Sequence, residues 1–218
     1  MDVRLHFIKE SNMCYLHMSQ MSGKLLGVGA LGTSCLDNQF CLERMSDKTK
    51  ICSVCYAVQS QKFRKQIYSA LHRNVDKLSM IIPEEFLPVT ENAFFRFEPF
   101  GDLICREQLI NYVHIAEKNP QTFFALWTKN LWFLRDVFSE MDKPDNMSVV
   151  VSSDTINKII DIKELEGTCA DVIYTVYDKD FIKENKIDVD CYKGIRCLSC
   201  KKCYRQYDTP RLISAIVR

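Results

Sequence analysis

The chain has 218 residues, of which 47% are hydrophobic and 26% are charged, and its formal net charge is +1. This composition is ordinary for a globular protein, so we expect a single (βα) domain over residues 1–218. A charge near zero gives no argument for nucleic-acid binding through the field of the whole molecule, and no apolar run is long enough to predict a membrane span. The first residues lack the pattern of an export signal, which predicts a cytoplasmic protein.

The N-terminal part predicts a short apolar segment, a loop and one long helix. Residues 24–31 (KLLGVGAL) are the apolar segment, and a cysteine-rich stretch follows at about 33–57. Apolar residues then recur near a 3.6-residue period from Tyr56 to about Met80. This spacing predicts a helix that ends before Pro83.

From residue 93 onward, apolar segments alternate with amphipathic ones. Strands are predicted at 93–100, 122–128, 147–153 and 171–177, and helices at 105–119, 131–141, 156–167 and 210–218. Such alternation is typical of βαβ units with parallel strands. Because a complete eight-stranded barrel usually needs about 250 residues, we predict an α/β fold that forms a partial or compact (βα) barrel.

Polar residues follow each predicted strand. The carboxyl ends of parallel strands are where ligands bind in such folds, although Asp, Ser and Thr there also serve as helix N-caps. Lys129 is a poor N-cap and is therefore the stronger candidate for a ligand-binding role. Arg96 and Glu98 lie in a predicted strand, where each charge is expected to be paired or functional. The strand-end residues are Gly101-Asp102, Thr128-Lys129, Ser152-Ser153-Asp154 and Tyr177-Asp178.

Eleven cysteines are many for a chain without an export signal, and they favour metal binding or catalysis over disulfides. In the C-terminal cysteine-rich segment, at about 191–205, two successive Cys-x-x-Cys intervals predict a metal site. Basic residues beside it would offset the charge of several thiolates. The cysteines of this set are Cys191, Cys197, Cys200 and Cys203.

The N-terminal set has a looser spacing. Cys52 and Cys55 are suitable metal ligands, and Cys35 and Cys41 would complete a site of four thiolates. A redox dithiol is the alternative, but that chemistry needs the motif at the start of a helix after a strand, and no strand is predicted before Cys52. Metal binding is therefore the favoured interpretation.

Three of these elements resemble the phage "gene product 88" family. They are Cys-x-x-Cys-Tyr-Ala at 52–57, Phe-Arg-Phe…Gly-Asp at 95–102 and Leu-Trp-Thr-Lys at 126–129. This family and related Cys-x-x-Cys-Tyr-Ala phage and bacterial proteins are similar in layout to radical S-adenosylmethionine proteins, in which an N-terminal cysteine triad precedes a partial (βα) barrel. The compact Cys-x3-Cys-x2-Cys loop of those enzymes is absent here.

The resemblance implies a [4Fe–4S] cluster on Cys35, Cys52 and Cys55, with one iron open for S-adenosylmethionine, and an unknown substrate. Cys41 is an extra candidate ligand. The C-terminal cysteines would hold a second cluster or contribute to the same one. The implied catalytic residues are Asp102, Lys129 and Asp154, and the implied cofactor-binding residues are Tyr56, Gly101, Thr128 and Ser152.

Two other hypotheses stay open. The first is a zinc-binding barrel that modifies nucleic acid, resembling a base-exchanging transglycosylase, with Asp102 or Asp154 as nucleophile and the basic C-terminal segment near phosphate. The second is a non-catalytic binding protein whose fold is stabilised by bound metal. Visible absorption distinguishes iron–sulfur clusters from zinc thiolates.

Overall fold

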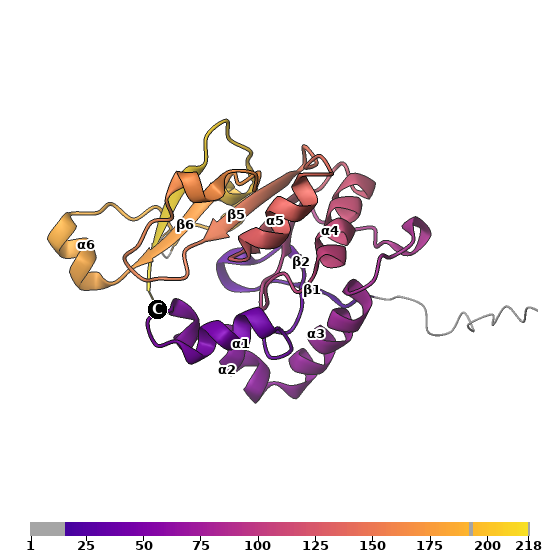
Figure 1. Cartoon of the computed structure of the whole chain (residues 1–218), viewed down its shortest axis with the longest axis horizontal. Helices are drawn as coiled ribbons and strands as arrows, with labels where there is room; N and C mark the ends of the chain where they lie inside the picture. Colours follow the sequence, from indigo (N-terminus) through magenta and orange to yellow (C-terminus); the bar gives the residue numbers. More distant parts are fainter. Residues whose placement is uncertain (1–15, 192–193, 218) are drawn as a thin grey trace, which may run out of the picture.

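The computed structural model describes residues 16–191 and 194–217, and its centre is a seven-stranded sheet (Figure 1). The strands lie in the sheet in the order of the sequence, and every neighbouring pair is parallel except the first, β1 with β2. They are β1 (Met18–Gln20), β2 (Gly29–Leu31), β3 (Phe94–Phe97), β4 (Phe123–Thr128), β5 (Met147–Ser152), β6 (Val172–Tyr177) and β7 (Arg211–Ile216).

The predicted α/β fold with parallel strands is confirmed. The sheet does not close on itself, which is compatible with a partial barrel. Its inner strands are rich in β-branched and aromatic residues, and β5 is buried along its whole length, as expected for a parallel strand covered on both faces.

Helices of two kinds surround the sheet. The α-helices are α1 (Gln39–Ser46), α2 (Tyr56–Phe63), α3 (Lys65–Leu78), α4 (Arg106–Lys118), α5 (Leu131–Phe138), α6 (Lys179–Asn185) and α7 (Cys197–Cys200). The short 3-10 helices are η2 (Gly23–Leu25), η3 (Ile51–Val54), η4 (Glu84–Phe86), η5 (Ile162–Leu165) and η6 (Lys202–Tyr204). No helix in the described ranges is long and apolar enough to cross a bilayer.

One face of the sheet packs against α4, α5 and Leu78 at the end of α3, and forms the larger core. Aromatic rings stack across it: the centroid of Phe97 lies 4.1 Å from that of Tyr112 and 5.0 Å from that of Phe124. Offset aromatic pairs of this kind add about 0.5–1.5 kcal/mol beyond the burial of their area. The core therefore fixes β3 and β4, whose carboxyl ends carry several candidate residues.

The other face is covered by η2 and the C-terminal segment that contains α7 and η6. Here Phe94 packs edge-on against Tyr204, and Trp127 packs against Tyr174. The backbone carbonyl of Arg205 accepts a hydrogen bond from the Ser148 hydroxyl at 3.1 Å, which ties this segment to β5. The C-terminal cysteines consequently lie over the sheet rather than at its carboxyl edge.

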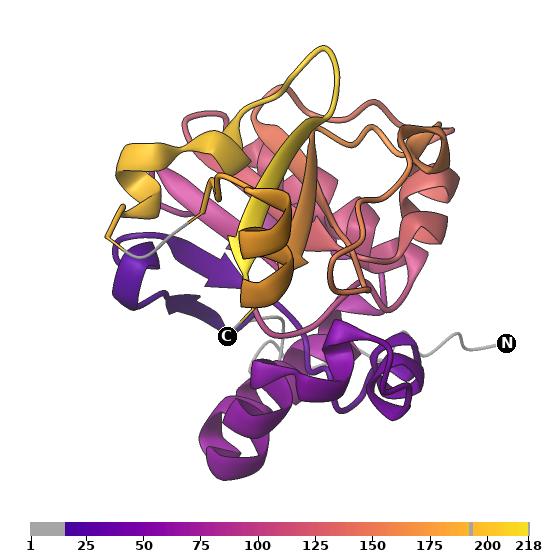
Figure 2. The same ribbon diagram turned by 90° about the vertical axis from the view of Figure 1, so that its left-hand side faces the viewer.

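Helices α1, α2 and α3 form a separate layer at the carboxyl end of the strands (Figure 2). The segment between α1 and η3 is fixed to the loop after β5, because the Ile51 N–H donates to the Asp154 carbonyl at 2.7 Å. This contact brings the N-terminal cysteine loop next to the strand ends.

Two of the predicted helices are wrong, and a third is confirmed as two consecutive helices. The helix predicted from Tyr56 to Met80 is broken at Arg64, whose φ of −120° and ψ of 84° are not helical. Residues 156–167 form only the short η5, because Asn157 takes a φ of +63° and exchanges hydrogen bonds with Asp178. Residues 210–218 contain β7 instead of a helix, since β6 offers an open edge and β-branched residues suit a strand.

Candidate functional site

The four N-terminal cysteines come from adjacent segments and are called here the N-terminal thiol group. Cys35 lies in the loop after β2, Cys41 in α1, Cys52 in η3, and Cys55 directly before α2. Asn38 begins α1 by accepting hydrogen bonds from the Phe40 and Cys41 N–H groups, a typical N-cap. The cap directs Cys41 toward the other thiols.

The thiols of this group interact with one another. A hydrogen bond from the Cys35 thiol lowers the pKa of Cys55 to about 6, and the Val58 and Ala57 N–H groups at the start of α2 contribute to the same effect. Burial raises the pKa of Cys41, and the nearby Asp102 carboxylate raises it further. Burial also raises the pKa of Cys52, against the opposing effect of the Lys129 ammonium.

A buried carboxylate holds the loop that leads to Cys35. Glu98 accepts hydrogen bonds from the Thr33 N–H and hydroxyl at 3.2 and 3.0 Å, from Gln108 at 2.6 Å, and from the Tyr112 hydroxyl. Burial raises the pKa of Glu98 to about 8, although these hydrogen bonds act in the opposite direction. Glu98 is therefore held by hydrogen bonds and has no ion pair in the described ranges. The contacts join the cysteine loop to α4.

Asp102 organises the next turn. Its carboxylate accepts hydrogen bonds from the Leu103 N–H at 2.8 Å, from the Lys129 N–H at 2.9 Å, and from the Thr128 hydroxyl. Asn38 donates to the Asp102 carbonyl at 2.8 Å. Burial raises the pKa of Asp102, and the Lys129 ammonium lowers it. Both carboxylate oxygens have partners, which suits a positioning role more than a nucleophilic one.

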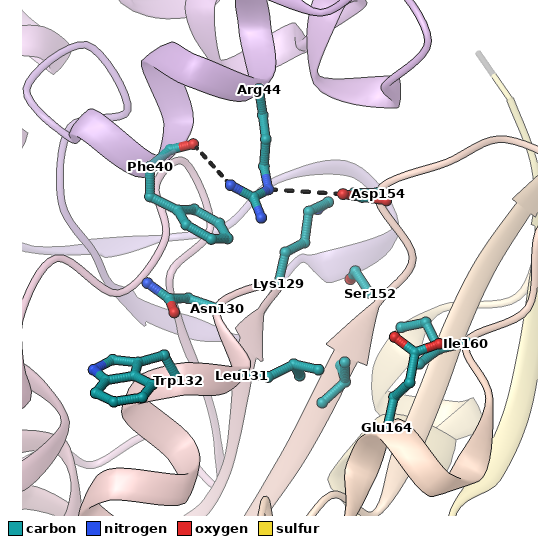
Figure 3. Close-up of a pocket in the computed structure, with 11 residues that line it drawn as sticks. Phe40, Arg44, Lys129, Asn130, Leu131, Trp132, Ser152, Asp154, Ile160 and Glu164 are labelled. Carbon is teal, nitrogen blue, oxygen red and sulfur yellow. Dashed lines mark hydrogen bonds and ion pairs between the residues drawn. The ribbon is translucent and has the colours of Figure 1, made fainter.

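A pocket with a volume of about 320 Å³ lies beside the N-terminal thiol group, at the ends of β4 and β5, and is called here the strand-end pocket (Figure 3). Three predicted site residues line it: Lys129, Ser152 and Asp154. Asp154 forms an ion pair with Lys50 at 2.9 Å, and Arg44 lies 3.7 Å from the same carboxylate. The pairing with Lys50 and Arg44 lowers the pKa of Asp154, against the effect of partial burial.

The other predicted residues near the strand ends do not line this pocket. Tyr56 is 57% exposed, and its hydroxyl donates to the Pro99 carbonyl. A Cβ atom on Gly101 would lie 2.5 Å from a Glu98 carboxylate oxygen and 2.6 Å from the Thr33 carbonyl oxygen, so only glycine fits. The Thr128 hydroxyl donates a hydrogen bond to the Asp102 carboxylate and accepts one from the Asn130 N–H at 2.9 Å. In the structure these residues position the loops around the site.

The four C-terminal cysteines, Cys191, Cys197, Cys200 and Cys203, are called here the C-terminal thiol group. Burial raises the pKa of Cys203 to about 12, and the neighbouring Cys191 adds to the effect. The Lys24 ammonium donates to the Cys191 sulfur at 2.7 Å, and Tyr174 forms a hydrogen bond with the same thiol. Cationic and donor groups thus gather around these sulfurs.

Two polar atoms beside the C-terminal thiol group are buried without a hydrogen-bond partner. They are the Nε of Arg96, whose guanidinium lies 4.2 Å from the Trp127 ring centroid, and the hydroxyl of Tyr204. Buried donors without partners are costly and unusual in native proteins. An anionic centre among the thiols would supply acceptors for both.

The basic residues of the C-terminal segment are partly engaged in packing. Lys202 forms an ion pair with Asp190 at 2.7 Å, and the Lys201 ammonium lies 5.2 Å from the Phe94 ring centroid. Arg196 and Arg205 are exposed. Nucleic-acid binding through this segment stays a prediction.

Within residues 16–191 and 194–217, no group of three or more His, Cys, Asp or Glu side chains is arranged to hold a metal ion. Cys14 lies outside the described residues.

Several residues around the two thiol groups were not predicted as site residues. Arg44 and Asn130 line the strand-end pocket, and Lys24 and Tyr174 contact Cys191. Asn130 directly follows Thr128-Lys129, so the strand-end pattern would have included it if extended by one residue. Arg44 carries no such signal, because its position depends on how α1 packs.

The chain was compared with protein families, curated proteins and solved structures. The model of the family described as Gene product 88 matches residues 8–209. Neither the curated proteins nor the solved structures give a significant match. The family match extends over the cysteine loop, the parallel sheet and the C-terminal thiol group, and on this basis the chain belongs to the Gene product 88 family.

Proposed function

We propose that this protein is an iron–sulfur enzyme whose N-terminal thiol group binds a [4Fe–4S] cluster beside the strand-end pocket. One observation carries the proposal: interacting thiols from successive segments lie at the carboxyl end of a parallel sheet, next to a pocket with cationic side chains. In parallel α/β folds this edge is where substrates bind.

The residues present suit an anionic thiolate cluster. Lys129 acts on Cys41, Cys52 and Cys55 in the direction that favours thiolates. The Arg44 Nε is buried without a hydrogen-bond partner, and Arg44 also favours the thiolate of Cys52. Hydrogen bonds and nearby charges are the means by which proteins tune such clusters.

A cluster on three thiolates fits this position better than zinc on four. Zinc bound by four thiolates is a closed structural site without an open coordination position, and such a site has no need of a pocket beside it. We propose Cys35, Cys52 and Cys55 as the ligands, because the Cys35–Cys55 hydrogen bond and the Cys52–Cys55 interaction join them directly. The Asp102 carboxylate raises the pKa of Cys41, which disfavours its thiolate, so Cys41 is the alternative third ligand.

The finer proposal is that S-adenosylmethionine is the cofactor. When bound and reduced by an added one-electron donor such as dithionite, a cluster with one open iron would supply the electron that cleaves a C–S bond of that molecule. The chain's own contribution is positional: Asp102 fixes the backbone of Lys129, which directs the ammonium toward the thiols and the pocket. Tyr56, through Pro99, fixes the loop beside Cys55.

The C-terminal thiol group is proposed to hold a second, separate metal centre. Its sulfurs interact with Lys24, Arg96 and Tyr174 over the sheet, whereas Lys129 acts on the N-terminal thiols. The two groups therefore do not share one cluster in this proposal.

The experiment is metal and sulfide analysis of protein purified without oxygen, together with a visible spectrum. We expect brown protein with about four irons and matching acid-labile sulfide per iron–sulfur cluster, followed by reductive cleavage of added S-adenosylmethionine. Colourless protein with stoichiometric zinc would reject the proposal. In that case Asp154, the partly exposed carboxylate of the pocket, becomes the candidate nucleophile of a zinc-stabilised barrel.

A further inference from the structure

The strand-end pocket has the size of a site for one small molecule. Its volume of about 320 Å³ lies at the low end of the range of about 300–1,000 Å³ that small-molecule sites occupy. Leu131, Val151 and Ile160 form the apolar part of its lining, called here the apolar floor, and Figure 3 shows Leu131 and Ile160 among the polar side chains of the pocket.

Polar groups of the pocket are left without protein partners. The Ser152 hydroxyl makes no hydrogen bond within the described ranges although the residue is only 8% exposed. The Lys129 ammonium likewise makes no ion pair or hydrogen bond in the part of the chain that the structure describes. The Ser152 hydroxyl and the half-buried Lys129 ammonium can therefore both donate hydrogen bonds to a ligand in the pocket.

The unmatched charge in the pocket is positive. Of the two carboxylates that line it, Asp154 has its own cation, Lys50, and Glu164 is exposed to solvent. The Arg44 Nε lies 3.7 Å from an Asp154 oxygen, an ion pair without a hydrogen bond, and the guanidinium donates to the Phe40 carbonyl at 3.5 Å. Lys129, which forms no ion pair in the described ranges, and Arg44, which shares Asp154 with Lys50, together suit a doubly charged phosphate.

Aromatic side chains stand beside these cations. Trp132 is 68% exposed at the rim, and Phe40 lines the same pocket with the Arg44 guanidinium 3.4 Å from its ring centroid. An exposed indole next to a ligand pocket provides a stacking surface for a planar ring such as a nucleobase.

We propose that the strand-end pocket binds a small anion that carries a planar ring, with the chemistry of a nucleoside monophosphate. The phosphate lies between Lys129 and Arg44 with Ser152 as a hydrogen-bond donor, and the ring lies over the apolar floor toward Trp132. This inference rests on the proposed function, because it names the substrate class of the same site.

The test is titration calorimetry of the full chain as purified, with four separate ligands: the monophosphates of adenosine, guanosine, cytidine and uridine. We expect saturable binding of at least one of them. We also expect its parent nucleoside and inorganic phosphate each to bind at least about tenfold more weakly, since a tenfold loss corresponds to about 1.4 kcal/mol.

Substitutions separate the two parts of the ligand. Lys129→Gln is expected to weaken binding of the monophosphate at least about tenfold while leaving the nucleoside's weak binding unchanged, and Trp132→Ala to weaken both. Lys183→Gln, on the exposed surface of α6, is the matched control and is expected to have no effect. Circular dichroism of each variant checks that it folds.

Failure of this inference is distinguishable from failure of the proposed function. If none of the four monophosphates binds, or if binding is indifferent to Lys129→Gln, the ligand class is wrong even when the protein is brown. If a monophosphate binds as expected to colourless zinc protein, the ligand class stands and the iron–sulfur proposal falls.

Discussion

The two thiol groups use the same side chain in different surroundings. The N-terminal thiol group lies at the carboxyl edge of the sheet, beside a polar pocket and between loops that Glu98 and Asp102 hold in place. The C-terminal thiol group lies over the sheet among aromatic rings, with Lys24 and Arg96 as its cations.

The surroundings, more than the ligands, indicate what each centre does. A centre beside a pocket can meet a substrate, whereas a centre enclosed by Trp127, Tyr174 and Tyr204 fastens a segment to the sheet. The proposal therefore places chemistry at the N-terminal thiol group and stabilisation at the C-terminal one.

The largest effects that test this division of roles are expected when one cysteine is removed from each group. Cys203→Ser is expected to lower the free energy of unfolding by about 4 kcal/mol or more, because a structural thiolate site contributes roughly 10–16 kcal/mol and Cys203 also packs in the core. Cys52→Ser is expected to lower the free energy of unfolding by only about 1 kcal/mol, which is the usual effect of a substitution at a less buried position. Urea denaturation measures both, and equal losses would contradict the division of roles.

The next largest effect concerns Glu98. Glu98→Ala leaves the buried donors of Thr33, Gln108 and Tyr112 without an acceptor, and we expect a loss of about 3 kcal/mol or more in the free energy of unfolding. Metal bound by the N-terminal thiol group is expected to fall, while metal bound by the C-terminal thiol group is retained. Loss of both metals in folded protein would contradict a local role for Glu98.

The raised pKa of Glu98 predicts that the stability of the folded protein depends on pH. Its pKa in the folded protein is about 8 against an ordinary value of 4.5, so the folded state binds the proton more tightly than the unfolded state does. Its contribution to stability is complete below the ordinary pKa and is lost as the pH rises toward 8. Stability relative to Glu98→Gln should fall across this range, by at most about 1.4 kcal/mol per pH unit. A flat difference between the two proteins would show that Glu98 does not titrate there.

A smaller effect is expected at Gly101. The added Cβ of Gly101→Ala would press on a Glu98 oxygen and on the Thr33 backbone, and the required shift is expected to cost about 1–3 kcal/mol. Gly194→Ala is the control in the C-terminal segment, since its Cβ would meet open space and only its φ of 112° opposes the change. Iron content should fall in Gly101→Ala alone, and a fall in both variants would contradict the prediction.

The smallest effect is expected at Tyr56. Tyr56→Phe removes the hydrogen bond to the Pro99 carbonyl and should cost about 0.5–1.5 kcal/mol. Because the ring stays in place, the cluster is expected to assemble normally but to be lost faster during exposure to air, which the decay of its visible absorption measures. Decay at the wild-type rate would show that this tie does not protect the N-terminal thiol group.

The parallel sheet could be predicted because its strands are apolar runs of regular length separated by helical patterns. The helix at 156–167 failed because the hydrogen bonds between Asn157 and Asp178, far apart in sequence, replace it. The strand at the C-terminus was missed because its partner, β6, supplies the pairing that a short apolar segment alone does not reveal.

The candidate site was predicted in part for a similar reason. Lys129, Ser152 and Asp154 lie at strand ends, which parallel topology brings together, and all three line the pocket. Arg44 was missed because the Ile51–Asp154 backbone contact, a tertiary feature, places α1 over the strand ends. Asp102 was predicted as catalytic, and its three hydrogen bonds are visible only in the folded chain.

The central claim is that the N-terminal thiol group binds an iron–sulfur cluster of its own, and iron and sulfide analysis of three proteins tests it most directly. Wild type, Cys52→Ser and Cys105→Ser, in which the replaced thiol belongs to neither group, are purified without oxygen. The account predicts that Cys52→Ser alone loses about four irons and the matching sulfide, while it stays folded. Iron-free wild type, or unchanged iron in Cys52→Ser, would contradict it.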